Sequence, residues 1–180
     1  MNKLVFVIIA LLGLTIFSCQ PKVSEKETIV NRIDTLEYMI YESGETLLDN
    51  KKPKEVSVLY KEYAAKYPED SVSVKYLFKA AQVEVGLGES LVAIHTLDTL
   101  INRYPNAEII PNVLQFKAFI YDDRLDRVNK ATAVLDIIIE KYPDCDIIDN
   151  VKAYKETLGK SPEEIILEME AKQKQEETVK

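Results

Sequence analysis

The sequence predicts an all-α protein built from repeated pairs of helices. The chain of 180 residues contains only 5 glycines and no tryptophan, and a composition low in glycine favours helices over sheets. Several segments space their apolar residues three and four apart, which is the period of an amphipathic helix. A Tyr-Pro pair also recurs at intervals of 37 and 38 residues, at Tyr67-Pro68, Tyr104-Pro105 and Tyr142-Pro143. A fixed interval of this length is typical of a helical repeat.

The charge of the chain limits its partners. The formal net charge is −7 at pH 7. Binding to nucleic acid requires a basic surface, and adhesion to anionic lipid requires clustered lysine or arginine. The sequence therefore predicts neither a nucleic-acid partner nor electrostatic attachment to a membrane.

Residues 1–18 have the pattern of a secretory signal peptide. Lys3 precedes an apolar run from Leu4 to Phe17, which is too short to span a bilayer comfortably. The run ends in Ile16-Phe17-Ser18-Cys19, which resembles a lipobox. This resemblance implies cleavage before Cys19 and acylation of Cys19, where more than one acyl chain would give stable anchoring. A plain signal peptide and an uncleaved anchor are the alternatives. Gln20 after the cysteine resembles an outer-membrane sorting signal, and residues 19–28 are expected to be the lipidated cysteine and a flexible tether.

Residues 29–160 are expected to form the repeat domain. Phe78-Lys79-Ala80 and Phe116-Lys117-Ala118 repeat at the 38-residue offset. Gly86-Leu87-Gly88 separates two helices, and prolines close each unit because they cannot continue a helix. The predicted helices are 27–47 and 53–66 in the first unit, 71–85 and 89–103 in the second, 109–121 and 127–142 in the third, and 147–158 after them. Residues 161–180 are predicted as a capping helix with a polar tail, which opens with a capping box at Ser161-Pro162-Glu163-Glu164.

These units resemble the tetratricopeptide repeat family. Small residues stand where the two helices of a unit approach, and a proline closes each unit. The resemblance covers about residues 30–145 and implies a right-handed superhelical stack of about three helix pairs. The elongated Tyr-Pro form is most similar to tetratricopeptide lipoproteins of bacterial envelopes, including the outer-membrane β-barrel assembly lipoprotein and the cell-division coordinator family. Phe119 departs from the pattern, because a small residue is expected there.

The resemblance implies a peptide-binding groove on the first helices of the units. The family's groove positions correspond to residues of all three units, with Tyr41, Phe78 and Phe116 at one equivalent position. Aromatic anchors surrounded by charge suit peptide binding. The alternative is that these aromatic residues pack between helices. The expected groove residues are Tyr38, Tyr41, Glu42, Lys75, Phe78, Lys79, Gln82, Val113, Phe116, Lys117 and Ile120.

Little in the sequence suggests chemistry. The single histidine, His95, is expected on a surface, since one histidine makes neither a metal site nor a catalytic triad. Asp122, Asp123 and Asp126 lack the spacing of a calcium loop and are expected in a turn between helices. Cys145 is expected to be a small structural residue, although an odd thiol in an exported protein can also be reactive. No cofactor and no metal are expected.

The sequence thus predicts a non-catalytic, lipid-anchored scaffold of the bacterial cell envelope. It would be held in the outer membrane facing the periplasm and would bind an envelope protein or peptide segment. Outer-membrane assembly and envelope maintenance are the processes that the resemblance suggests. The alternatives are a binding lipoprotein that captures a small ligand or envelope polymer in the groove, and an enzyme, for which no acid–base group set is visible. The oligomeric state is left open.

Overall fold

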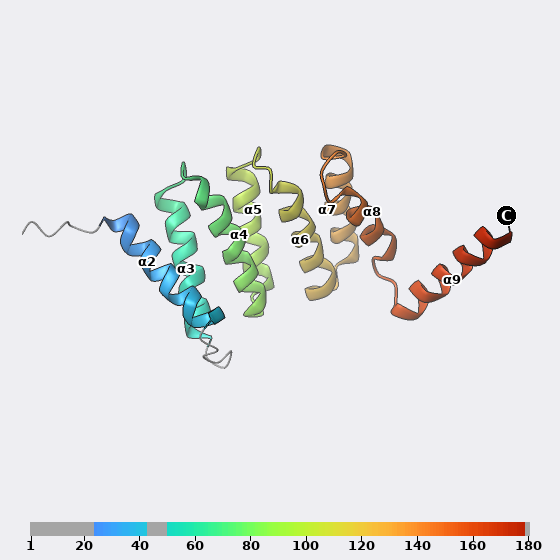
Figure 1. Ribbon diagram of the computed structural model, residues 1–180, viewed down its shortest axis with the longest axis horizontal. Helices are drawn as coiled ribbons and strands as arrows, with labels where there is room; N and C mark the ends of the chain where they lie inside the picture. The colour runs from blue at the N-terminus through green and yellow to red at the C-terminus, as the bar shows by residue number, and fades with distance from the viewer. Residues whose placement is uncertain (1–23, 43–49, 179–180) are drawn as a thin grey trace, which may run out of the picture.

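A computed structural model describes residues 24–42 and 50–178 of the chain, and these residues form an all-helical stack (Figure 1). Eight α-helices and no strands occur among them, which confirms the predicted fold class. Two short π-helical segments continue α2 and α6. The elements are α2 (Glu25–Glu37), η1 (Tyr38–Glu42), α3 (Lys51–Lys66), α4 (Ser71–Gly86), α5 (Ser90–Arg103), α6 (Ile110–Phe119), η2 (Ile120–Arg124), α7 (Val128–Lys141), α8 (Ile148–Thr157) and α9 (Pro162–Thr178).

Each helix from α2 to α8 packs on the next helix along the chain, and neighbouring helices run in alternate directions (Figure 1). Small residues allow the close approach of the pairs: Val56, Ala81, Ala93 and Ala131 are fully buried. The predicted signal peptide and Cys19 lie outside the described residues, and so do residues 43–47 of the first predicted helix. The helix α2 begins at Glu25, two residues before its predicted start, because Ser24 and Glu27 form a capping box. Residues 25–28, expected in the tether, are therefore helical.

The Tyr-Pro pairs form three equivalent turns. Tyr67, Tyr104 and Tyr142 end α3, α5 and α7 with φ of −126°, −127° and −132° and ψ of 59°, 56° and 50°. A following proline disfavours helical geometry at the residue before it, and none of the three tyrosines is helical. In each turn the tyrosine carbonyl accepts a 3.1 Å hydrogen bond from the amide three residues later, which belongs to Asp70, Ala107 or Cys145. The proline thus fixes the same angle between successive units.

Asp70 strengthens the first of these turns. Its carboxylate caps α4 by accepting from the Val72 amide at 2.9 Å, and it also accepts from the Tyr63 hydroxyl at 2.7 Å and from Lys26 at 2.5 Å. These hydrogen bonds, that from Lys26 first, hold the pKa of Asp70 well below its usual value. One carboxylate therefore joins α2, α3 and α4.

The connection between α6 and α7 differs from the simple turn predicted over residues 122–125. The helix continues as the π-helical segment η2, and Asp126 then adopts a positive φ of 51°. The Tyr121 carbonyl accepts from the Arg127 amide at 2.7 Å, which closes the segment. A π-helical turn inserts an extra residue into the helix, and hydrophobic periodicity alone does not detect it.

The apolar core forms two clusters along the stack. The first joins α2 and α3 to α4, with Ile33 and Tyr60 fully buried. The second runs from the end of α3 to α8 and includes Leu97, Leu135 and Val151, which are also fully buried. A core extended along the stack rather than concentrated in one centre is expected of repeats, because each unit packs mainly on its neighbours.

The helix α8 covers the end of the stack, while α9, which was predicted as a capping helix, stands apart from it. Val151 of α8 is fully buried against the core, whereas α9 projects away from the stack (Figure 1). The capping box that starts α9 is present as predicted, since the Ser161 amide donates to Glu164 at 2.7 Å. The apolar residues Ile166, Leu167 and Met169 are nevertheless 55–65% exposed.

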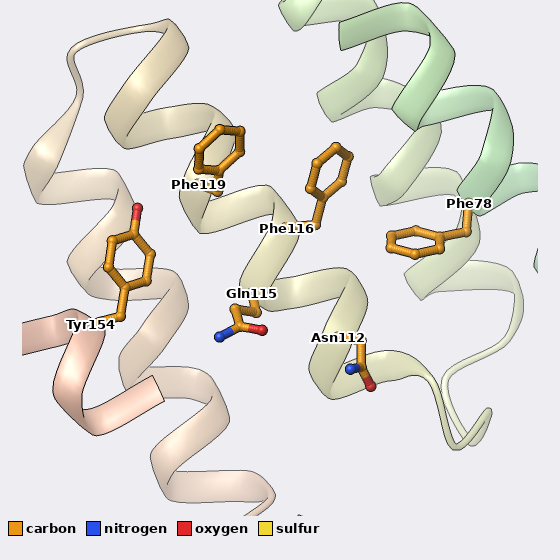
Figure 2. Close-up of a pocket in the computed structure, with 6 residues that line it drawn as sticks. All are labelled: Phe78, Asn112, Gln115, Phe116, Phe119 and Tyr154. Carbon is orange, nitrogen blue, oxygen red and sulfur yellow. The ribbon is translucent and has the colours of Figure 1, made fainter. Parts of the chain in front are cut away.

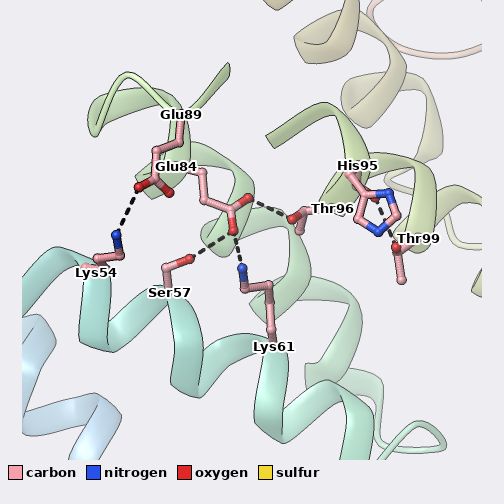
Figure 3. Close-up of polar contacts among 8 residues, drawn as sticks. All are labelled: Lys54, Ser57, Lys61, Glu84, Glu89, His95, Thr96 and Thr99. Atoms are coloured by element: carbon pink, nitrogen blue, oxygen red, sulfur yellow. Dashed lines mark hydrogen bonds and ion pairs between the residues drawn. The ribbon is translucent and has the colours of Figure 1, made fainter. Parts of the chain in front are cut away.

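A buried carboxylate joins three helices near the middle of the stack (Figure 3). The Glu84 side chain on α4 is 1% exposed. It accepts hydrogen bonds from Ser57 at 3.2 Å and Thr96 at 2.7 Å, and it forms a 2.5 Å ion pair with Lys61. A buried charge is stable only when paired and hydrogen-bonded. This network therefore fixes the positions of α3 and α5 on either side of α4.

We predict that Glu84→Ala destabilises the protein by about 2–3 kcal/mol, because it leaves two buried hydroxyls and the Lys61 ammonium without their acceptor. Urea denaturation followed by circular dichroism measures this loss. The matched control is Lys54→Ala, which removes an exposed ion pair to Glu89 and should change stability little. Equal effects of the two substitutions would contradict the assigned role of Glu84.

Candidate functional site

An aromatic residue occupies the same repeat position on three alternate helices, α4, α6 and α8. Phe78 lies on α4, Phe116 on α6 and Tyr154 on α8, each 38 residues after the last. The rings of Phe78 and Phe116 meet edge to face, with centroids 5.6 Å apart and planes at 82°. Phe119, one turn further along α6, stacks on Phe116 at 6.1 Å. The repeat interval thus brings the rings into one row (Figure 2).

These four rings line a pocket that is open to solvent. Its volume is about 500 Å³, and the side chains of Asn112 and Gln115 on α6 complete its lining. Figure 2 shows the rings of Phe116 and Phe119 rising from α6, with Phe78 and Tyr154 on the two neighbouring helices. We call this the aromatic pocket: Phe78, Asn112, Gln115, Phe116, Phe119 and Tyr154. Its lining is apolar apart from two amides and one hydroxyl, so it suits an apolar group attached to hydrogen-bonding groups.

Tyr154 is fixed at one end of the aromatic pocket. Its hydroxyl donates to the Asp122 carboxylate at 2.9 Å, which joins α8 to η2. Burial, followed by this hydrogen bond, raises the pKa of Tyr154 well above its usual value. The hydroxyl therefore stays protonated at neutral pH, and the side chain cannot act as a base there.

The structure places some of the predicted groove residues in the aromatic pocket and others outside it. Phe78 and Phe116 both line the aromatic pocket, while Lys75 and Gln82 are exposed on α4 outside its lining. The assignment of Ile120 and Val113 to the groove is wrong, because both are fully buried in the core. A side chain with no exposed surface cannot contact a partner.

The predicted pair of groove lysines forms ion pairs instead. Lys117 contacts Asp98 of α5 at 2.5 Å and lines a separate hollow between α5, α6 and α7, so it is not among the lining residues of the aromatic pocket. Lys79 contacts Glu37 of α2 at 2.8 Å. The pair of Lys155 with Asp136 repeats the pair of Lys117 with Asp98 one unit, or 38 residues, later in the chain. These lysines therefore join neighbouring helices.

Tyr38 and Tyr41 lie apart from the aromatic pocket. They are 63% and 64% exposed and line a shallow hollow of about 250 Å³ on the first helix, together with Asp34 and Glu37. Glu42 ends η1 beside them. Tyr41 keeps the repeat position of Phe78, but the row of touching rings begins at Phe78.

Sequence reasoning missed four residues of the aromatic pocket: Asn112, Gln115, Phe119 and Tyr154. A signal was present for each. Asn112, Gln115, Phe116 and Phe119 follow the three-and-four spacing of one helix face. Tyr154 continues the 38-residue offset of Phe78 and Phe116.

The other residues considered for chemistry have structural or surface positions. His95 is exposed, as predicted. Cys145 is a half-buried free thiol whose amide closes the third Tyr-Pro turn. In the part of the chain that the structure describes, no group of three metal-ligating side chains gathers. Within the same residues, no helix combines the length and the apolar character needed to cross a membrane.

We predict that the aromatic pocket contributes less to stability than the core does. Phe116→Ala should cost about 1–2 kcal/mol, since its ring is half exposed, whereas Leu135→Ala should cost about 3 kcal/mol or more because the leucine is fully buried. Urea denaturation of the two variants provides the comparison. A loss at Phe116 as large as that at Leu135 would instead assign the ring to the core.

Comparison with known proteins agrees with this architecture. Residues 75–107 match the family model described as a tetratricopeptide repeat, and the match covers most of α4 and all of α5. Searches of curated proteins and of solved structures gave no match. The segment 75–107 also holds Phe78 and the buried Glu84. The chain therefore carries a tetratricopeptide repeat within an all-helical stack of the same kind, a fold that generally mediates protein–protein interaction.

Proposed function

We propose that this chain is a lipid-anchored, non-catalytic scaffold that docks a segment of a partner protein in the bacterial cell envelope. The observation that supports this most directly is the aromatic pocket, which is open to solvent across α4, α6 and α8. Half-buried aromatic side chains in a concave site are typical anchors for a partner's apolar residue. The scaffold would present these rings at fixed spacing along the stack.

The shape and lining of the pocket favour a peptide segment. An enclosed cavity would surround a small molecule, whereas an open pocket across several helices leaves room for a chain to enter and leave. The amides of Asn112 and Gln115 can each donate to and accept from a peptide backbone. The lining includes no carboxylate, thiol or imidazole, so the proposal gives the pocket no role in proton transfer or nucleophilic attack.

The anchor rests on the amino-terminal sequence, which lies outside the described residues. Lys3, the apolar run to Phe17 and the lipobox-like Ile16-Phe17-Ser18-Cys19 are arranged in the order that lipoprotein processing requires. Residue Gln20 supports outer-membrane sorting and a position facing the periplasm. The short segment between Cys19 and the start of α2 at Glu25 would hold the stack close to the membrane surface.

We predict that Cys19 carries the lipid. Cells expressing the full chain and grown with an alkyne-labelled fatty acid should incorporate the label into the wild-type protein and into Cys145→Ser, but not into Cys19→Ser. Labelling that persists in Cys19→Ser would contradict the proposed anchor.

A second candidate is a lipoprotein that captures a small ligand or an envelope polymer in the same pocket. Four aromatic rings beside two amides also provide stacking faces and hydrogen bonds for such a ligand. A photoreactive group in the pocket distinguishes the two candidates, because a scaffold would be crosslinked to a protein and a ligand-binding lipoprotein to a saccharide or lipid.

We predict that p-benzoylphenylalanine in place of Gln115 crosslinks the full chain to one envelope protein in living cells. The product should disappear when Phe78→Ala and Phe116→Ala are added, because the anchor side chains are then lost. The same photoreactive residue in place of exposed His95 on α5 is the positional control and should give no such product. Circular dichroism checks that all variants fold equally.

A protein product that is independent of both phenylalanines would overturn the pocket assignment. A product of unchanged protein mass that carries saccharide or lipid would favour the second candidate.

A further inference from the structure

The helix α9 lacks the apolar residues that it would need to extend the stack. It occupies the chain positions of a second helix in a fourth unit, since α7 shifted by 38 residues falls on residues 166–179. At this offset the buried Leu135 corresponds to Gln173, and the buried Ile138 to Glu176. Polar residues at these positions cannot replace apolar core contacts. The stack therefore offers α9 no equivalent packing site.

The connection between α8 and α9 directs α9 away from its own groove. Gly159 adopts a φ of +70°, and a Cβ there would lie 3.1 Å from Val128 Cγ1, so the turn fits only glycine against α7. The capping box of Ser161 and Glu164 then begins α9 at once, and Lys160 contacts Glu168 at 2.6 Å. These contacts order the first turns of α9, and Figure 1 shows the helix projecting away from the stack. Only residues 158–161 separate α8 from α9, so a return to the groove of the same chain would require this short connection to rearrange around Gly159.

The start of α9 nevertheless carries an apolar face. Ile165, Ile166 and Met169 fall on one side by their three-and-four spacing, and Ile166 and Met169 are 55% and 60% exposed. Leu167 points to a different side of the helix. An exposed face of this kind on an otherwise polar helix indicates a binding partner. Methionine and isoleucine suit an aromatic pocket, because the flexible thioether makes favourable contacts with ring edges.

Charge at the edges of the two surfaces is complementary. Glu163 and Glu170 lie along one edge of the apolar face of α9, are exposed, and have no ion pair among residues 24–42 and 50–178. Lys75 lies one turn before Phe78 on α4, is also exposed, and is likewise unpaired within these ranges. The lining of the aromatic pocket contains no acidic side chain that would repel α9. Opposite charges around an apolar contact favour one orientation of docking.

We propose that α9 of one copy docks in the aromatic pocket of a second copy of this chain. Ile166 and Met169 enter beside Phe78, Phe116 and Phe119, while Glu163 or Glu170 approaches Lys75. The inference rests on the proposed function, since it uses the same pocket. A reciprocal exchange of α9 between two copies closes into a dimer, and a one-way exchange adds further copies. The self-association would compete with a peptide for the pocket and so regulate its availability.

The test uses two differently tagged full-length copies expressed together, both carrying Cys145→Ser. One copy carries Gln115→Cys in the pocket, and the other carries Met169→Cys on α9. Oxidation in intact envelopes should give a disulfide-linked species with both tags. Its yield should exceed by at least about tenfold that of a control pair in which His95→Cys replaces Gln115→Cys, because docking raises the effective concentration of the two thiols.

Two substitutions on α9 test the assigned face without altering the stack. Ile166→Glu in the α9 donor should reduce the crosslink to the control yield, whereas Leu167→Glu should leave it unchanged, since Leu167 lies off the docking face. No species with both tags, equal yields at residues 95 and 115, or equal effects of the two glutamates would each overturn the proposal. A single chain with both cysteines that closes an internal disulfide without dimer would overturn it too, by placing α9 in its own pocket.

This result is separable from that of the proposed function. If photocrosslinking at residue 115 captures another envelope protein and the cysteine pair gives no species with both tags, the scaffold function stands and the self-association is overturned. If only the cysteine pair reacts, the pocket binds this chain and the envelope-partner function fails.

Discussion

The whole arrangement depends on the Tyr-Pro turn that closes each helix pair. Proline removes a backbone donor and disfavours helical geometry at the tyrosine before it, so each second helix ends at a fixed residue. The three tyrosines adopt closely similar backbone angles, and each turn is closed by the same amide-to-carbonyl hydrogen bond. Equal turns place equivalent residues of successive units on one face. The row of rings in the aromatic pocket and the ion pairs between units both follow from this regularity.

A change of charge in the first unit explains why the buried carboxylate exists. Asp98 and Asp136 occupy one repeat position, and each pairs with a lysine of the next helix. The equivalent residue in the first unit is Lys61, which would repel Lys79 at the corresponding lysine position. The structure resolves this conflict with two carboxylates: Glu84 binds Lys61, and Glu37 binds Lys79. The desolvation cost of burying Glu84 is offset by hydroxyl donors from the helices on either side.

Much of the fold followed from periodicity, whereas the parts that depend on contacts between helices did not. Apolar spacing and the recurring Tyr-Pro pairs placed seven helices from α2 to α8 with boundaries close to those observed, except where residues lie outside the described ranges. The π-helical continuation at Ile120 was not predictable, because it shifts side chains around the helix without altering the sequence pattern. Because of this shift, Ile120 is buried in the core. Lys117 is one residue beyond Phe116, so it lies on another side of α6 and pairs with Asp98. Of the expected groove residues, Phe78 and Phe116 therefore line an open pocket, whereas Lys117 and Ile120 do not.

The aromatic residues pack against one another and are also open to solvent, so packing and binding, the two roles that the sequence left open, do not exclude each other. Their rings contact one another across helices, which is packing, yet they also line an open pocket. The two roles are compatible because a short stack has a small core, so large rings at its surface also contribute to packing between helices. A ring already held by its neighbour loses little conformational freedom when a partner covers its exposed side. Packing between units thus pre-organises the surface that the units present, and the same repeat interval determines both.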